Sequence, residues 1–314
     1  MPSTYAHCRL GKEIISRLNP QEREIIKENL HLYQAGLHGP DILFYYDALH
    51  PNGVNKIGNL LHQESGKKFF SRCAQKLDES FHKDASLAYI YGVLAHFALD
   101  VSCHGYVNML TDTTDLQHTE IEGEFDRYLM LKDGLNPVTH SLTRHIHPST
   151  FNARVIAPFY PGVSEEEVLR SLIDMVKENR ILLCKNPLKR NFLYMLMHIG
   201  GVYPQLHGMI INPDGNPECE KSNEKLMELY RTGCSRAASF INEFLSWKEG
   251  KVEIDPVFDY TFEGIPEAES RADAEESDES TESAGSRESA ESAQSLGASQ
   301  YAASGVSDEA VDAE

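Results

Sequence analysis

The chain has 314 residues and carries 48 acidic against 29 basic side chains, a formal net charge of -19. Its basic residues form no stripe interleaved with aromatic residues. This argues against nucleic-acid binding driven by phosphate neutralisation, so no stable nucleic-acid partner is expected. The chain also holds no run of about 18 apolar residues, the length that a transmembrane helix requires.

Cysteine usage and the start of the chain favour a cytoplasmic protein. The stretch "MPSTYAHCRLGKEII" lacks the basic start and the apolar core of a secretory signal. Six cysteines are scattered along the chain with no Cys-x-x-Cys pair. Without a signal, such cysteines are expected to be free thiols rather than a disulfide framework.

Helical periodicity dominates the sequence. Two helices are expected first, in "GKEIISRL" and in "PQEREIIKENLHLYQAG", the second with Pro20 in its first turn and its end at Gly36. Strand-like alternation is confined to "VEIDPVFDYTF" near the end. The pattern predicts an all-α protein with a single helical domain over residues 1–262. The other helices are expected at residues 55–82, 84–105, 118–133, 165–181, 188–204 and 222–248.

The composition changes after this domain. From Pro266 to Glu314 the chain has 14 acidic residues and two arginines, and it is rich in Ser, Ala and Glu. Such a segment buries too little apolar surface to offset the entropy of ordering it. Residues 263–314 are therefore expected to be a disordered acidic tail.

The stretch "VLAHFALDVSCHGY" places ionisable groups inside an apolar helix. His96, Asp100 and His104 follow one another at four-residue spacing, so each step rotates the side chain by about 40° and rises about 6 Å. Buried ionisable groups need a partner, and a charged one must be paired or bound to a metal. A hydrogen-bonded trio in a bundle core is the alternative to a metal site.

A second stripe favours the metal site. His118 and Glu122 again stand four residues apart, and imidazole nitrogen and carboxylate oxygen are ligands that suit zinc. His96 and His104 lie about 12 Å apart along the helix axis, too far for one tetrahedral ion, so they should bind different ions with Asp100 able to bridge. A di-iron site would need Glu-x-x-His spacing instead. The candidate zinc ligands are His7, Asp41, His62, His96, Asp100, His104, His118 and Glu122.

The order of these residues resembles the zinc-dependent phospholipase C family, which is similar to the single-strand-specific zinc nucleases. A His near the start, an Asp in a loop and a single His precede His-x3-Asp-x3-His, and His-x3-Glu follows after 13 intervening residues. The resemblance implies an all-helical domain with a cluster of three zinc ions, whereas the eight candidate ligands by themselves suffice for two or three. By residue matching, one ion takes Asp41, His62, His96 and Asp100; a second takes His104, His118 and Glu122; a third takes His7, Asp100 and the N-terminal amine and carbonyl.

This resemblance implies a zinc-dependent phosphodiester hydrolase in which a metal-bound hydroxide attacks the phosphorus of a phospholipid or a similar phosphodiester. Asp41 is expected either to ligate zinc or to act as general base. Two alternatives stay open: a single-strand-specific nuclease, and a non-catalytic helical scaffold whose zinc sites are closed by four protein ligands. Of the other histidines, His38 is expected to be a loop residue or a neighbour of the site, and His145 and His147 surface residues.

Overall fold

Helices make up nearly all the regular structure in residues 4–267, the part of the chain that the computed structural model describes. These residues contain no β-strand, only two isolated bridges, between Ser65 and Thr261 and between Tyr260 and Pro266. The prediction of an all-α fold is confirmed. The alternating segment 252–262 forms a short 3-10 helix, η6 (Pro256–Asp259), rather than a strand. Of the expected tail, residues 263–267 are described with the helical unit, and residues 268–314 lie outside the described part.

Several expected helices are interrupted, and the others differ mainly at their ends. The expected helix at 20–36 is two helices that meet at Asn29, and the one at 188–204 ends at Ile199 and is followed by a short helix from Tyr203. The helix Thr150–Ile156 was not expected. The expected helix at 55–82 is two helices, interrupted at Glu64 and Ser65, where the backbone is extended. The α-helices are α1 (Thr4–Ile14), α2 (Pro20–Glu28), α3 (Leu30–Gly36), α4 (Gly53–Gln63), α5 (Gly66–Glu79), α6 (Lys83–Thr113), α7 (His118–Lys132), α8 (Thr150–Ile156), α9 (Glu165–Leu182), α10 (Pro187–Ile199), α11 (Tyr203–Leu206) and α12 (Glu220–Lys248). The other 3-10 helices are η1 (Ile15–Arg17), η2 (Gly39–Tyr45), η3 (Ala157–Phe159), η4 (His207–Met209) and η5 (Pro217–Cys219).

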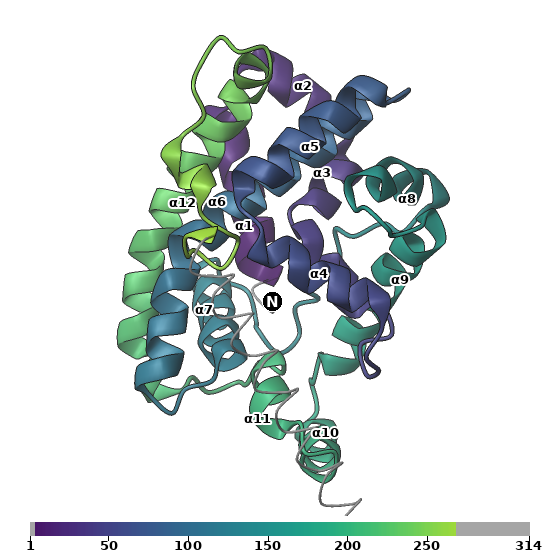
Figure 1. Ribbon diagram of the computed structural model, residues 1–314. Coiled ribbons are helices and arrows are strands. Elements are labelled where there is room, and N and C mark those ends of the chain that lie inside the picture. The colour runs from purple at the N-terminus through teal and green to yellow at the C-terminus, as the bar shows by residue number, and fades with distance from the viewer. Residues whose placement is uncertain (1–3, 268–314) are drawn as a thin grey trace, which may run out of the picture. The chain divides into compact units, whose positions relative to one another are not determined.

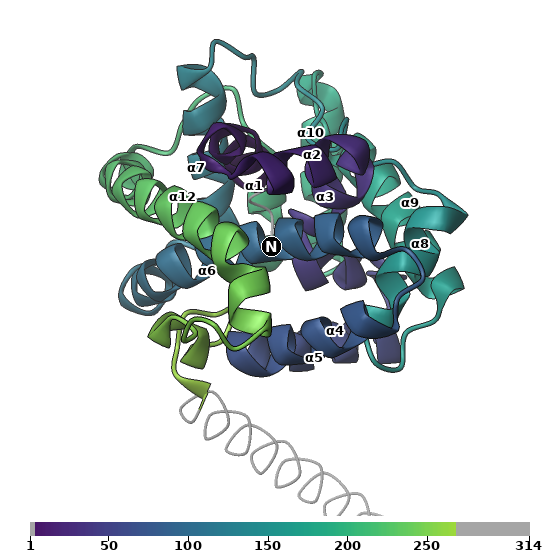
Figure 2. The ribbon, with the colours of Figure 1, turned by 90° about the horizontal axis from the view of Figure 1, so that it is seen from above.

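The centre of the domain is α6, a helix of 31 residues that is apolar on almost every side. It packs chiefly against α12 and α3 and runs between them through the middle of the molecule (Figures 1 and 2). A helix that is apolar all round belongs in a core. By length and composition α6 could also cross a membrane, but 89% of its most apolar window is buried inside the domain.

Two glycines bring α3 directly against α6. A Cβ at Gly36 would lie 2.3 Å from the carbonyl oxygen of Tyr89, and one at Gly92 would lie 2.2 Å from the carbonyl oxygen of Tyr33. Only glycine permits backbones to come this close. The contact sets the position of α6 one turn before His96.

The last part of the helical unit folds back onto its core. The carbonyl oxygen of Tyr260 accepts a hydrogen bond from the backbone N–H of Gly66 at 2.9 Å. The side chain of Phe262 is fully buried and meets the rings of Phe69 and Phe97 edge-on, with ring centroids 5.4 and 5.1 Å away. This return brings residues 258–263 beside the middle of α6.

Candidate metal centre

The polar stripe of α6 points into the domain rather than toward solvent. His96, Asp100 and His104 are all buried, and His96 is fully so. Neither ring nitrogen of His96 has a hydrogen-bond partner among residues 4–267, although its Nε2 lies 2.9 Å from Oδ2 of Asp100. Buried polar atoms are rarely left without a partner. A cation between these two atoms would satisfy both, so the stripe has the properties of a metal site.

Asp100 lies between three imidazoles. Its Oδ1 is 3.2 Å from Nε2 of His7 and 3.9 Å from Nε2 of His104, while its Oδ2 faces His96. Burial alone would raise the pKa of Asp100, but the imidazoles of His96, His104 and His7 hold that pKa well below its usual range. The carboxylate is therefore ionised, and each of its two oxygens is placed to coordinate a cation.

The helix η2 and α4 bring Asp41 and His62 to the same place. Asp41 Oδ1 lies 2.8 Å from His62 Nε2 and 3.7 Å from His96 Nε2. His62 Nδ1 donates a hydrogen bond to the carbonyl oxygen of Gly58 at 2.7 Å, which leaves Nε2 facing the carboxylate. Gly39, at φ +46°, packs its Cα against His96, since a Cβ there would lie 2.4 Å from the imidazole Cδ2.

A third group forms where α7 meets α6. Oε1 of Glu122 lies 3.2 Å from Nε2 of His104 and 3.3 Å from Nε2 of His118. Burial would lower the pKa of His104, but the charges of Asp100 and Glu122 raise it to about 10. The His118 side chain is about 29% exposed, so this group is the one open to solvent.

All eight predicted ligands lie in these three groups, in each of which one ligand atom per residue lies within 4.8 Å of the others. His96 belongs to two groups. Asp100 was matched to two ions, that of Asp41, His62 and His96 and that of His7; the structure groups it with His7, as expected, together with His96, while Asp41 and His62 are grouped with His96 alone. The terminal amine expected beside His7 lies outside the described residues. Three protein ligands per ion is the number found in catalytic zinc sites, which keep a further position open.

The geometry around the imidazoles also fits zinc. His62 and His104 each face a backbone carbonyl with Nδ1 and a carboxylate with Nε2. Because a carbonyl oxygen only accepts, Nδ1 carries a hydrogen, and a metal ion that displaced the proton of Nε2 would lie between the Nε2 lone pair and the carboxylate. Zinc-binding histidines have this arrangement, in which the second nitrogen is held by a carbonyl or a carboxylate.

His145 is not the surface residue that the sequence predicted. Its exposed fraction is 8%, and its Nε2 lies 2.7 Å from Nε2 of His38, so one ring donates and the other accepts. Burial lowers the pKa of His38 well below its usual range and that of His145 to about 3. The ring of His38 in turn lies 6.5 Å from that of His7. The neighbouring Ile146 is buried and was the one apolar signal in "RHIHPS".

Asp126 was also missed. Its carboxylate accepts hydrogen bonds from the backbone N–H groups of Tyr5 and Ala6, at 2.9 and 2.8 Å, in the first turn of α1. These groups have no partner within their own helix, and a carboxylate is favourable at a helix N-terminus. Asp126 thus fixes the start of α1 and with it His7. The sequence did hold a signal for this role, because Asp126 follows Glu122 by four residues and so lies on the same face of α7.

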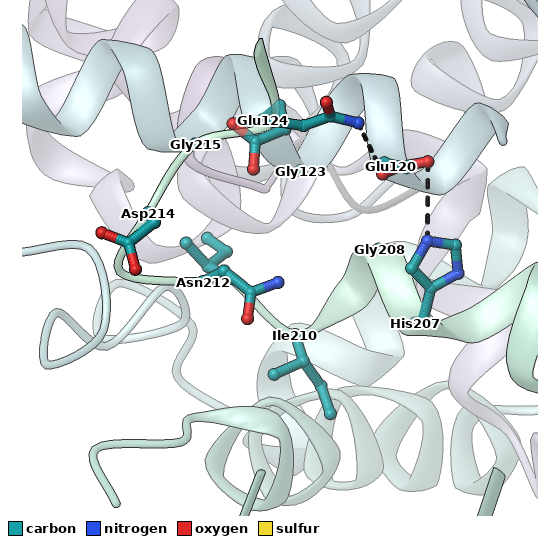
Figure 3. A pocket seen from close by; sticks show the side chains of 11 residues that line it. Glu120, Gly123, Glu124, His207, Gly208, Ile210, Asn212, Asp214 and Gly215 are labelled. Atoms are coloured by element: carbon teal, nitrogen blue, oxygen red, sulfur yellow. Dashed lines mark hydrogen bonds and ion pairs between the residues drawn. The ribbon is translucent and has the colours of Figure 1, made fainter. Parts of the chain in front are cut away.

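A separate cavity of about 160 Å³ lies on the other side of α7 (Figure 3). It is lined by Glu120 and Glu124 of α7 and by Asp214 of the loop between η4 and η5, and Glu120 accepts a hydrogen bond from Asn216 at 3.0 Å. None of the eight predicted ligands lines it. Its carboxylates would repel a phosphate, so this cavity is not the place for an anionic substrate.

Residues 6–161 match the family described as zinc dependent phospholipase C, a segment that contains all eight grouped residues. Comparison with curated proteins and with solved structures finds no match.

Proposed function

Because residues 6–161 belong to the zinc-dependent phospholipase C family, we propose that this chain hydrolyses a phospholipid or a similar phosphodiester with two or three zinc ions. The observation that carries the proposal is that all three groups of ligands meet at the polar stripe of α6: His96 belongs to two groups, Asp100 to one of these, and His104 to the third. A purely structural trio of buried polar groups would instead be hydrogen-bonded within itself, and His96 is not.

Each group has a defined role in this proposal. His7, His96 and Asp100 would hold one ion, Asp41 and His62 with His96 would hold or share another, and His104, His118 and Glu122 would hold the one nearest solvent. Bound zinc supplies Lewis acidity, which acidifies water to a pKa of about 7 and polarises phosphoryl oxygens. The three carboxylates offset only part of the ions' charge, so an anionic phosphodiester is attracted without a basic surface.

The protein's own contribution is orientation and proton transfer. The carbonyl oxygens of Gly58 and Phe262 hold His62 and His104 in one tautomer. Asp41, within 2.8 Å of His62, either completes the ligand set or accepts the proton from the attacking water. The burial of these groups keeps competing solvent away from the charged atoms.

The test combines metal content with substrate choice. Native mass spectrometry counts the zinc ions, while the same sample is assayed on a chromogenic phosphocholine diester and on a single-stranded oligonucleotide. Zinc together with turnover of the diester supports the proposal. Turnover of the oligonucleotide alone would assign a nuclease, and bound zinc with neither activity would assign the structural scaffold.

A further inference from the structure

The helix α10 carries an apolar stripe that faces solvent. Leu188 and Ile199, at its two ends, are 76% and 77% exposed, and Phe192, Met195 and Leu196 between them are also exposed. At 3.6 residues per turn these five positions fall within about 100° of one another. Exposed apolar residues scattered singly are ordinary, but a continuous stripe along one helix is not.

The opposite side of α10 is the one that packs. Met197 is buried there in a small cluster with Cys184 and Ile210, separate from the main core. The segment that follows α10 is tied to α7: Thr119 donates a hydrogen bond to the carbonyl oxygen of Gln205 at 2.9 Å, and a Cβ at Gly123 would lie 2.3 Å from the carbonyl oxygen of Gly208. The exposed stripe is therefore not needed to hold α10 in place.

The charge of this region is opposite to that of the chain. Residues 179–213 contain no Asp or Glu, and they contain four basic residues, in a protein with a formal net charge of -19. Three of the four lie at or just before the start of α10, and Lys189 also donates a hydrogen bond to the carbonyl oxygen of Leu183 at 3.0 Å. The four are Arg180, Lys185, Lys189 and Arg190.

We propose that α10 docks this protein on an anionic phospholipid surface. The apolar stripe would enter the boundary between head groups and acyl chains. Lys185, just before α10, and Lys189, which borders the stripe, would lie toward the anionic head groups, as in amphipathic helices that lie in a membrane interface. A second copy of the chain is the alternative occupant of the stripe, and sedimentation velocity tests it below. The elements after α10 contact the start of α7, the helix that carries His118 and Glu122 (Figure 1).

Binding of the full chain to sucrose-loaded vesicles tests this directly, and it requires no turnover, so its outcome is independent of the proposed hydrolysis. The vesicles are phosphatidylcholine alone or phosphatidylcholine with phosphatidylserine. The wild type should sediment with the anionic vesicles and be released by salt. The double variant Leu188→Ser, Ile199→Ser should bind the anionic vesicles at least about tenfold more weakly than the wild type. Lys185→Gln with Lys189→Gln should weaken binding to the anionic vesicles and reduce its dependence on salt.

The matched control removes two apolar side chains of equal exposure elsewhere. Leu49 and Phe81 are 83% and 100% exposed and lie outside α10, so Leu49→Ser with Phe81→Ser should bind like the wild type. The proposal is overturned if the wild type binds no vesicles, binds both kinds equally, or loses binding equally in the α10 variant and the control. It is also overturned if sedimentation velocity shows a wild-type dimer that the Leu188, Ile199 variant does not form.

Discussion

The carbonyl oxygen of Phe262 accepts a hydrogen bond from Nδ1 of His104 at 2.8 Å, although 158 residues separate the two in the chain. The bond places the hydrogen on Nδ1 and turns Nε2 toward Glu122. The Phe262 ring also lies beside the rings of His62 and His96, with centroids 5.6 and 5.8 Å away. The C-terminal return of the domain thus orients imidazoles that come from α4 and from α6.

Phe262→Ala should therefore weaken both the fold and the metal site. Loss of a fully buried ring should lower the free energy of unfolding by about 3 to 5 kcal/mol, and looser imidazoles should weaken zinc binding by about tenfold. Urea denaturation and competition with a chelating dye measure the two effects. Phe151→Ala removes a ring that is partly exposed, so it should cost less than about 1 kcal/mol and leave zinc affinity unchanged.

Asp100→Asn keeps the size of the side chain and removes the negative charge through which both carboxylate oxygens would bind zinc. We expect the loss of at least one zinc ion per chain and a fall of about hundredfold in phosphodiesterase rate. Mass spectrometry and the chromogenic assay give both values. Asp112→Asn is the control on the same helix, because Asp112 is exposed and should change neither value. Full metal content and full rate in Asp100→Asn would be incompatible with the proposed centre.

Gly92→Ala tests the contact that positions α6. The added methyl group would meet the backbone of α3, which cannot move aside as a side chain could, so we expect a loss of about 3 kcal/mol in the free energy of unfolding. Gly105 lies on the same helix, and a methyl group added there would have no neighbouring atom nearer than 3.8 Å. Gly105→Ala should instead stabilise the protein by about 0.5 kcal/mol, because alanine favours helix. Thermal unfolding of the zinc-free proteins compares them, and equal effects would contradict the contact.

Glu178 should make stability depend on pH away from the metal centre. Burial, followed by the charge of Asp174, raises the pKa of Glu178 to about 7 from an ordinary value of 4.5. Between these values the unfolded chain has lost a proton that the folded chain still holds, so stability falls as pH rises through this window and is level above it. Because the side chain is partly exposed, the effect is about 1 kcal/mol.

Glu178→Gln cannot ionise, so its free energy of unfolding should fall less over the same window than that of the wild type. Urea denaturation at a series of pH values measures the difference. Glu166→Gln alters an exposed residue of the same helix and should follow the wild-type curve. If the Glu178→Gln curve also runs parallel to the wild type, the burial of this carboxyl does not affect stability.

The sequence was informative wherever the spacing within one helix decides the outcome. Four-residue steps place His96, Asp100 and His104 on one face of α6, and His118 and Glu122 on one face of α7, whatever the helices pack against. Imidazole and carboxylate groups among apolar residues likewise indicate a metal site, and this inference needs no three-dimensional structure. The all-α class follows from the same periodicity.

Contacts between helices could not be obtained in this way. That His96 joins both the group of His7 and the group of Asp41 and His62, and that His145 is buried against His38, depends on how separate helices approach one another. The exposed stripe of α10 is a similar case, since its periodicity predicts an amphipathic helix but not which side the domain covers.

The physical reason is that the direction of a side chain is a local property of its helix, whereas its neighbours are set by packing over the whole chain. Close approaches such as that of Gly36 to Gly92 and the return of Phe262 onto α6 join residues far apart in sequence. Sequence by itself determined which groups could bind a metal and on which helix faces they lie; only the tertiary structure decided which of them meet.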